Sequence, residues 1–340
     1  MKLEIITTPN ETMKETGFGT QIACTSVMNS IKKSGHSVRV SSCTTEEDLR
    51  HVLKRKPDLA ILAVKYVAIE NGKDIWLSEY FTKNSVAHSG SSREALKFDS
   101  DKVLAKTHLK NKGIATAEFF TAFAGEHLTE DSLPLKYPLF LKPRDAANGN
   151  GIDDQSYIST FVEFQSKVAS IKKSYNQPTI AEEYLGGREF TVAVLQTKSG
   201  ELIVSPIEII PPKSNGGRRI LGSIVKKENS ETLKKIKDSA LRNRIKKMAV
   251  EVFIGVGADD FARIDIKTNT EGKCFFMEVN LVPGMTFGSS YFPEACRIDQ
   301  GMTYDQAIFH IVDQCLNKEI KKTQRTHLFP LRGKLTGVGQ

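Results

Sequence analysis

Hydrophobic and polar positions follow two alternating patterns over the first 95 residues. Short apolar runs at 3–7, 37–41 and 58–64 predict strands, and three- and four-residue apolar spacing at 21–33 and 45–54 predicts helices. This order predicts an open parallel sheet of the βαβαβ type. Ligands bind such sheets beyond the carboxyl ends of the strands, so the loops at 8–20 and 65–73 are the expected binding loops.

The pattern changes near residue 137, after which short strands and hairpins predominate. We predict strands at 139–142, 157–158, 179–184, 189–196 and 202–210, and helices at about 100–111, 160–171 and 231–253. The fold class is therefore α/β, with a C-terminal half of α+β character. Beyond Leu316 the chain becomes polar and basic, and from about Thr323 we expect poor order.

The composition is that of an ordinary globular protein. The chain has 340 residues, 39% of them hydrophobic and 26% charged, and this length favours two or three domains. The N-terminus lacks the apolar core of a secretory signal, and every apolar run is far shorter than the roughly 18 residues of a membrane helix. The five cysteines are widely spaced without a CxxC motif, which argues against a disulfide framework or a zinc site. We expect a cytoplasmic protein without a membrane partner.

Positive charge is concentrated in one segment. Residues 213–247 hold 12 basic and three acidic residues, a net charge of +9, so nucleic acid is one candidate partner. However, no aromatic residue is interleaved with the basic ones, and the lysines of 231–253 fall on the polar face of an amphipathic helix. A solvated face is the better interpretation. Segment 211–227, rich in Gly, Pro and Ser, is expected to be a mobile loop of the kind that closes over phosphates.

The richest chemistry lies in 260–280, where two alternating runs flank the turn-forming sequence TNTEG. Alternation places Arg263 and Asp265 on one face of the first strand, and Glu278 and Asn280 on one face of the second. A register in which paired residue numbers sum to 543 sets Asp265 opposite Glu278 and Arg263 opposite Asn280. The opposite face is predicted to hold the apolar residues Ala262, Ile264, Ile266, Phe275, Met277 and Val279.

Two carboxylates facing each other need positive charge. One interpretation is a structural salt bridge in which Arg263 supplies that charge. The other is a Mg²⁺ site, because this ion prefers oxygen ligands and is commonly held by one or two carboxylates together with substrate phosphates. The metal site is favoured, since other segments independently indicate phosphate binding.

Four segments, in the same order along the chain, resemble the ATP-grasp ligases and, among them, the D-alanine–D-alanine ligases. They are LFLKPRDAANGNGI at 139–152, IAEEYLGGREFTVAVL at 180–195, ARIDI at 262–266 and FFMEVNLVPGMT at 275–286. The resemblance implies an ATP-grasp fold behind an N-terminal open parallel α/β domain. The implied parts are a substrate-side domain at 1–95, a central subdomain at 96–185, a C-terminal subdomain with the metal and oxyanion site at 186–322, and a tail at 323–340.

The resemblance also implies an ATP site between the last two of these domains. Lys102 and Lys142 match the lysines that contact the α- and β-phosphates, and Lys226 falls where the mobile loop places a lysine on the γ-phosphate. Two Mg²⁺ ions are expected, with Mn²⁺ as an alternative metal. Their ligands would be Asp265, Glu278 and Asn280.

The resemblance also assigns residues to the adenine and the ribose of ATP. In the strand IAEEYL, the Glu182 side chain and the Glu183 carbonyl would accept hydrogen bonds from the adenine amino group, and the Leu185 N–H would face the ring. Glu189 is similar to the carboxylate that binds the ribose hydroxyls.

The implied reaction joins a carboxylate to an amine. ATP converts the carboxylate to an acylphosphate, and the amine of a second amino acid displaces phosphate. Arg263 and the Gly284 N–H resemble the groups that stabilise the resulting oxyanion, and Ser289 or Ser290 resembles the hydroxyl that receives a substrate carboxylate.

Several positions that handle the amino acid depart from the family pattern. The family's HGxxGEDG segment is KYVAIENGKD at 65–74, and neither Glu11 nor Glu15 aligns without a gap with the glutamate that binds the first ammonium group. Asn148 stands in place of a serine that helps to close the lid, and Lys227 in place of a tyrosine. These departures leave the reaction type secure and the choice of amino acids open.

The leading hypothesis is an ATP-dependent ligase of the D-alanine–D-alanine type that acts on small amino-acid substrates. One alternative is an ATP-grasp ligase that joins other amino acids in a secondary pathway. Another is a non-catalytic ATP-binding protein, which the retention of Arg263 and Gly284 disfavours. A nucleic-acid partner is not expected, and homodimers are usual in the family.

Overall fold

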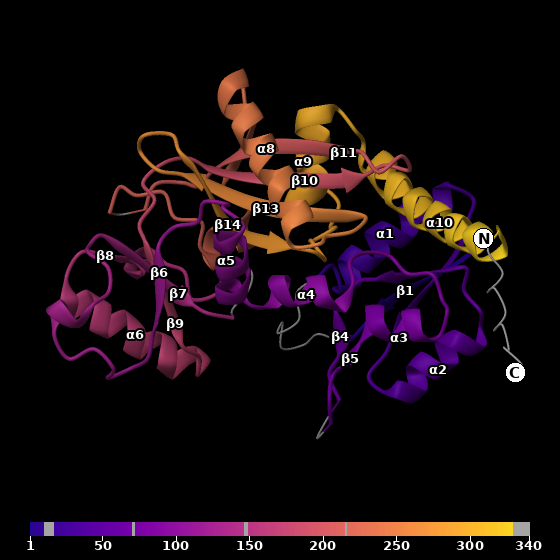
Figure 1. Cartoon of the computed structure of the whole chain (residues 1–340), viewed down its shortest axis with the longest axis horizontal. Coiled ribbons are helices and arrows are strands. Elements are labelled where there is room, and N and C mark those ends of the chain that lie inside the picture. The colour runs from indigo at the N-terminus through magenta and orange to yellow at the C-terminus, as the bar shows by residue number, and fades with distance from the viewer. Residues whose placement is uncertain (10–16, 70–71, 146–148, 215, 329–340) are drawn as a thin grey trace, which may run out of the picture.

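The computed structural model describes residues 1–9, 17–69, 72–145, 149–214 and 216–328, and its main sheets belong to successive parts of the chain (Figure 1). Asn148 and residues 10–16 of the first expected binding loop lie outside the described residues.

The N-terminal sheet is parallel, as the sequence predicts. Its strand order is β2 (Ser37–Ser42), β1 (Lys2–Thr7), β3 (Leu59–Leu62), with α1 (Gln21–Lys33) and α2 (Glu46–Lys54) in the crossovers. Hydroxyl groups start both helices: Thr20 accepts the Ala23 N–H, and Thr45 forms a reciprocal capping box with Asp48. A small hairpin of β4 (Tyr66–Val67) and β5 (Ile75–Trp76) then leads into α3 (Leu77–Lys83).

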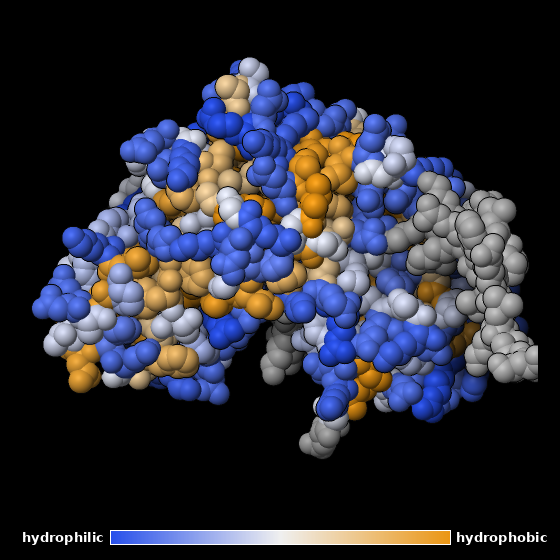
Figure 2. Space-filling view, viewed as in Figure 1, coloured by the Kyte–Doolittle hydropathy of each residue, from blue (hydrophilic) through white to orange (hydrophobic). Residues whose placement is uncertain are grey.

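A second, antiparallel sheet has the order β6 (Phe119–Ala122), β9 (Thr179–Glu183), β7 (Leu139–Pro143), β8 (Tyr157–Ile158). Helix α6 (Phe161–Tyr175) packs on it through Phe164 and Val168, which are buried against Leu139 and Leu141. Short 3-10 turns lie at Glu130–Ser132 and Asp154–Ser156. Figure 2 shows a notch in the surface between this lobe and the N-terminal lobe.

The helix predicted at about 100–111 is present at Lys102–Asn111, and a separate helix that the sequence pattern did not predict precedes it. Helix α4 (Arg93–Ser100) ends where Asp101 takes an extended conformation, and α5 (Lys102–Asn111) begins at the next residue. The Asp101 carboxylate accepts the Leu104 N–H at 3.0 Å, so this residue caps α5 rather than continuing α4. The break places Lys102 at the first position of α5.

The largest sheet has five strands in the order β12 (Thr232–Lys235), β11 (Leu202–Ile210), β10 (Glu189–Gln196), β13 (Phe261–Thr268), β14 (Cys274–Asn280). Helix α8 (Ser239–Gly255) packs across four of these strands, and α9 (Tyr291–Gln300) contacts β10 and β11. Helix α10 (Tyr304–Leu328) returns to α1 and so packs on the N-terminal lobe (Figure 1).

Two predictions for this part were wrong at one end of the segment. The helix predicted at 231–253 starts only at Ser239, because the Asp238 carboxylate caps it at the Leu241 N–H, and residues 232–235 pair with β11 as an edge strand. The segment expected to be a loop at 211–227 runs into helix α7 (Ser223–Glu228). Of the tail predicted at 323–340, residues up to Leu328 belong to helix α10, and residues 329–340 lie outside the described residues.

The sequence predicts neither disulfides nor membrane-spanning helices. All five cysteines are buried, and none of them forms a disulfide among the described residues. Among the residues that the structure describes, none of the helices combines the length and the apolar character that a membrane span requires.

Candidate active site

The hairpin of β13 and β14 has the predicted register where the chemistry lies. Arg263 pairs with Asn280 and Asp265 with Glu278, on one face of the sheet. The residues that alternate with them in β13 are fully buried on the other face: Ala262, Ile264 and Ile266. Alternation alone therefore brings the two carboxylates, the guanidinium and the amide together.

Beyond this pair the register shifts, which the sequence pattern did not predict. A bulge between Asp265 and Ile266 makes Ile266 pair with Phe276, so Met277 becomes the extra residue. Phe276 thus takes the core position, while Phe275 and Met277 pack with Leu185 in a separate cluster. The prediction that Phe275 and Met277 share the core face with Val279 was wrong for this reason.

Two cavities meet at this hairpin. The larger one, about 280 Å³, is lined by Arg263, Asn280, Gly284, Ser289 and Ser290. The smaller one, about 80 Å³, lies against β9 and is lined by Lys142, Glu182, Glu183, Leu185 and Glu189. Both are lined by Lys102, Lys226 and Glu278, so these three residues stand where the cavities join.

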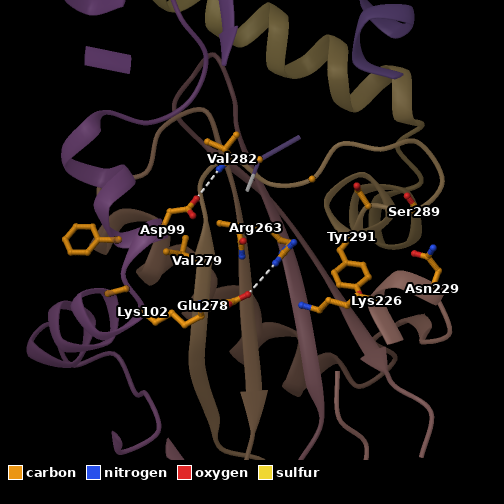
Figure 3. A pocket seen from close by; sticks show the side chains of 16 residues that line it. Asp99, Lys102, Lys226, Asn229, Arg263, Glu278, Val279, Val282, Ser289 and Tyr291 are labelled. Carbon is orange, nitrogen blue, oxygen red and sulfur yellow. Dashed lines mark hydrogen bonds and ion pairs between the residues drawn. The ribbon is translucent and has the colours of Figure 1, made fainter. Parts of the chain in front are cut away.

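Opposite charges surround the two carboxylates. Arg263 donates to Asp265 through Nε at 3.1 Å and a terminal nitrogen at 2.8 Å, and the same terminal nitrogen lies 3.7 Å from Glu278. Lys102 and Lys226 approach Glu278 from opposite sides (Figure 3), with the Lys102 Nζ at 3.9 Å. Burial alone would raise the pKa of Glu278, but Lys102, Lys226 and Arg263 hold it well below its usual range. The salt bridge considered from the sequence is thus formed.

The donor set also fits a magnesium ion. Asp265 and Glu278 offer carboxylate oxygens, and Asn280 offers an amide oxygen. The Asn280 amide nitrogen is buried and has no hydrogen-bond partner within the described part of the chain. Thr191, on the neighbouring strand β10, donates to Asp265 at 2.7 Å and orients that carboxylate.

A buried charge cluster lies beside the smaller cavity, and sequence reasoning found it only in part. The Glu182 carboxylate lies 2.6 Å from the Lys142 Nζ and 2.7 Å from the Nζ of Lys106, a residue that the sequence analysis did not select. Both oxygens of Glu182 thus face lysines. Further along the same wall, Glu189 lies 3.2 Å from the Lys267 Nζ.

A carboxylate fixes the turn that follows β14. Asp99 accepts the Leu281 N–H at 2.5 Å and the Val282 N–H at 3.3 Å, just before the Gly284 peptide group (Figure 3). Its other oxygen lies 3.0 Å from the Nζ of Lys65, and both side chains are buried. Sequence reasoning missed Asp99 and Lys65; the only signal was that Lys65 begins the segment that departs from the family pattern.

The Lys65–Asp99 pair leads to a stability prediction. Lys65→Met is expected to lower the free energy of unfolding by roughly 3 kcal/mol, because it leaves a buried carboxylate without its cation. Urea denaturation followed by circular dichroism measures the change. The matched control is Lys33→Met, which removes an exposed pair with Asp305 at 2.8 Å and should cost under about 1 kcal/mol. Equal losses in the two variants would contradict the prediction.

Comparison with known proteins agrees with this geometry. The sequence model of the family described as "D-ala D-ala ligase C-terminus" matches residues 108–313, more than half of the chain. The chain belongs to this family. D-alanine–D-alanine ligase B of Clostridium perfringens is 27% identical over 303 residues, which cover 87% of this chain and 93% of the relative. The D-alanine–D-alanine ligase of Aquifex aeolicus is 28% identical over 286 residues, covering 84% and 92%.

A solved structure from the family confirms the fold. The D-alanine–D-alanine ligase from Bacillus anthracis, complexed with ATP, matches 95% of this chain and 99% of its own chain with a TM-score of 0.72 and 21% identity. The ATP-grasp fold expected from the resemblance is therefore confirmed.

Proposed function

We propose that the protein is an ATP- and Mg²⁺-dependent ligase that joins the carboxylate of one amino acid to the amine of another through an acylphosphate, as a D-alanine–D-alanine ligase does. One observation carries the proposal: Lys102, Lys226 and Glu278 line both cavities. A phosphoryl group that leaves a nucleotide in the smaller cavity would pass between these residues into the larger one, where Arg263 and Gly284 stand.

The charges at the junction suit phosphoryl transfer. Lys102, Lys142 and Lys226 would hold the phosphates, and Asp265, Glu278 and Asn280 would hold Mg²⁺. When bound, Mg²⁺ supplies positive charge that offsets the charge on the transferred phosphoryl group. Leu185 and Met277, which pack together, would provide an apolar surface for the base.

Residues of the larger cavity would act on the amino acids. Attack of an amine on the acylphosphate creates an oxyanion, which needs donors already in place. The Arg263 guanidinium and the Gly284 N–H are the donors on this wall, and the turn that carries Gly284 is held by Asp99. Ser289 or Ser290 would bind the carboxylate of the attacking amino acid; the Ser290 hydroxyl also accepts the Thr286 N–H at 2.8 Å.

Glu189 provides a test of the nucleotide site. Glu189→Ala should raise the KM for ATP roughly tenfold, because a hydrogen bond to a charged group contributes about 1.5–3 kcal/mol and ribose contacts are equal in ground and transition states. The KM for amino acids should stay unchanged. Steady-state kinetics with each substrate varied in turn measures both values, and a selective rise in the amino-acid KM would argue against the assignment.

The function itself is tested by ADP release in the presence of Mg²⁺ and D-alanine, with mass spectrometry of the product. We expect ADP and a dipeptide in equal amounts. A panel of other D- and L-amino acids, singly and in pairs, covers a second candidate function, the joining of other amino acids. The buried Lys65–Asp99 pair favours including it, since Lys65 begins the altered segment at 65–74 and Asp99 lines the larger cavity. Binding of ATP without ADP release from any pair would overturn the ligase assignment.

A further inference from the structure

Lys106 is buried completely although it does not line either cavity. It lies four residues after Lys102 on α5, and therefore on the same face of that helix, which packs against β14 (Figure 1). Its Nζ lies 2.7 Å from Glu182, donates to the Thr116 hydroxyl at 2.8 Å and lies 3.4 Å from the Phe276 carbonyl oxygen. Lysine side chains are rarely buried completely, so a lysine with three buried partners indicates a specific role.

The cluster of Lys106, Glu182 and Lys142 holds two cations and one anion. The Glu182 carboxylate contacts one lysine with each oxygen, at 2.7 and 2.6 Å. Burial alone would raise the pKa of Glu182, but Lys106 and Lys142 lower it to about 2, so the carboxylate is ionised at neutral pH. With both lysines protonated the cluster carries a net charge of +1. Of the two lysines, Lys142 lines the smaller cavity and Lys106 does not.

Lys142 would be a poor phosphate ligand if it were the only partner of Glu182. A buried pair of one lysine and one carboxylate is neutral overall. Such a pair attracts an additional anion only weakly. Lys106 changes this balance by pairing with the second oxygen. We propose that Lys106 is a positioning residue for nucleotide binding, which shares the charge of Glu182 and so leaves the ammonium of Lys142 available to a phosphate. This inference rests on the nucleotide site of the proposed function, not on ligation.

Lys106→Met tests the inference, because methionine keeps an unbranched chain of similar length without the charge. The net charge of the cluster falls from +1 to zero. Calorimetric titration with adenosine, ADP and ATP, each with Mg²⁺ and without amino acids, separates base binding from phosphate binding. We expect ATP and ADP affinity to fall roughly tenfold, while adenosine affinity changes less than about twofold. A merely structural role would lower all three affinities together, and that result would overturn the proposal.

Two further variants complete the test. Lys110→Met, one turn later on α5, removes an exposed ion pair with Glu118 at 2.7 Å and should leave the affinity ratio of ATP to adenosine unchanged. In the double variant Lys106→Met/Glu182→Gln the cluster regains a charge of +1, carried by Lys142 alone. Its affinity ratio should return to the wild-type value even if its adenosine affinity falls. A ratio of ATP to adenosine affinity that stays low in the double variant would overturn the proposal. This measurement also tests the proposal if the single variant does not fold.

Nucleotide binding needs no turnover, so this experiment and the ligase assay can fail separately. If the variants bind adenosine, ADP and ATP as expected but the protein releases no ADP, the role of Lys106 stands and the ligase assignment is wrong. ADP and dipeptide formation with an unchanged ATP-to-adenosine ratio in Lys106→Met would do the reverse.

Discussion

Glu278→Gln should lower the rate of ATP turnover by roughly 10³-fold, since a metal ligand of this kind stabilises charge in the transition state by several kcal/mol. Glutamine keeps the size of the side chain and removes one negative charge from the junction of the two cavities. Lys102, Lys226 and Arg263, which lower the pKa of Glu278, would then lose this anion, and Arg263 would keep its pair with Asp265. The variant should therefore bind Mg²⁺ much more weakly.

Turnover of Glu278→Gln is best followed as ADP release over a Mg²⁺ titration. We expect little change in melting temperature. The matched control is Glu208→Gln on strand β11, which breaks a bidentate pair with Arg188, at 2.8 and 2.7 Å, outside both cavities. Turnover in the control should be close to wild type. Near-normal turnover of Glu278→Gln at limiting Mg²⁺ would refute the metal assignment.

Arg263→Lys is expected to lower kcat about 10²- to 10³-fold, the usual cost of losing one oxyanion donor. An ammonium keeps the charge and one contact to Asp265, but it cannot present a planar pair of N–H groups to Asp265 while also reaching the oxyanion. The KM for ATP should change little, because Arg263 does not line the smaller cavity.

Arg242→Lys is the control for this substitution. Arg242 makes a bidentate pair with the buried Asp299 at 2.7–3.0 Å, away from both cavities. This variant should have a lower melting temperature and an unchanged kcat. Arg263→Lys should instead keep its melting temperature and have a lower kcat. Similar kcat values for the two variants would show that Arg263 has only a structural role.

Local alternation was sufficient to predict the pairing of Asp265 with Glu278, because side-chain direction in a hairpin depends only on neighbouring residues. The bulge after Asp265 could not be predicted in the same way. Its cause lies in packing: Phe276 is wholly buried in the core, while Met277 packs beside Leu185, a residue almost one hundred positions earlier in the chain. No local pattern contains that information.

Buried charge was also hard to recognise from sequence. A lysine in an amphipathic helix ordinarily belongs to the solvated face, and Lys106 was overlooked for that reason. The available signal was its place between Ala105 and Leu109, both buried, and its four-residue spacing from Lys102. The edge strand β12 was missed because Leu233 and Ile236 fit the spacing of the helix that follows.

The Lys65–Asp99 pair joins two parts of the chain that otherwise look separable. Lys65 follows β3 of the N-terminal sheet, and Asp99 belongs to α4, on the other side of the boundary expected near residue 95. A chimera that exchanges the first 95 residues for those of a relative would remove the lysine and keep the aspartate. Recombination at this boundary would therefore disturb the turn at Leu281 and Val282, although both residues lie almost two hundred positions away. In this protein the N-terminal lobe is not an interchangeable module, and any exchange must transfer both partners.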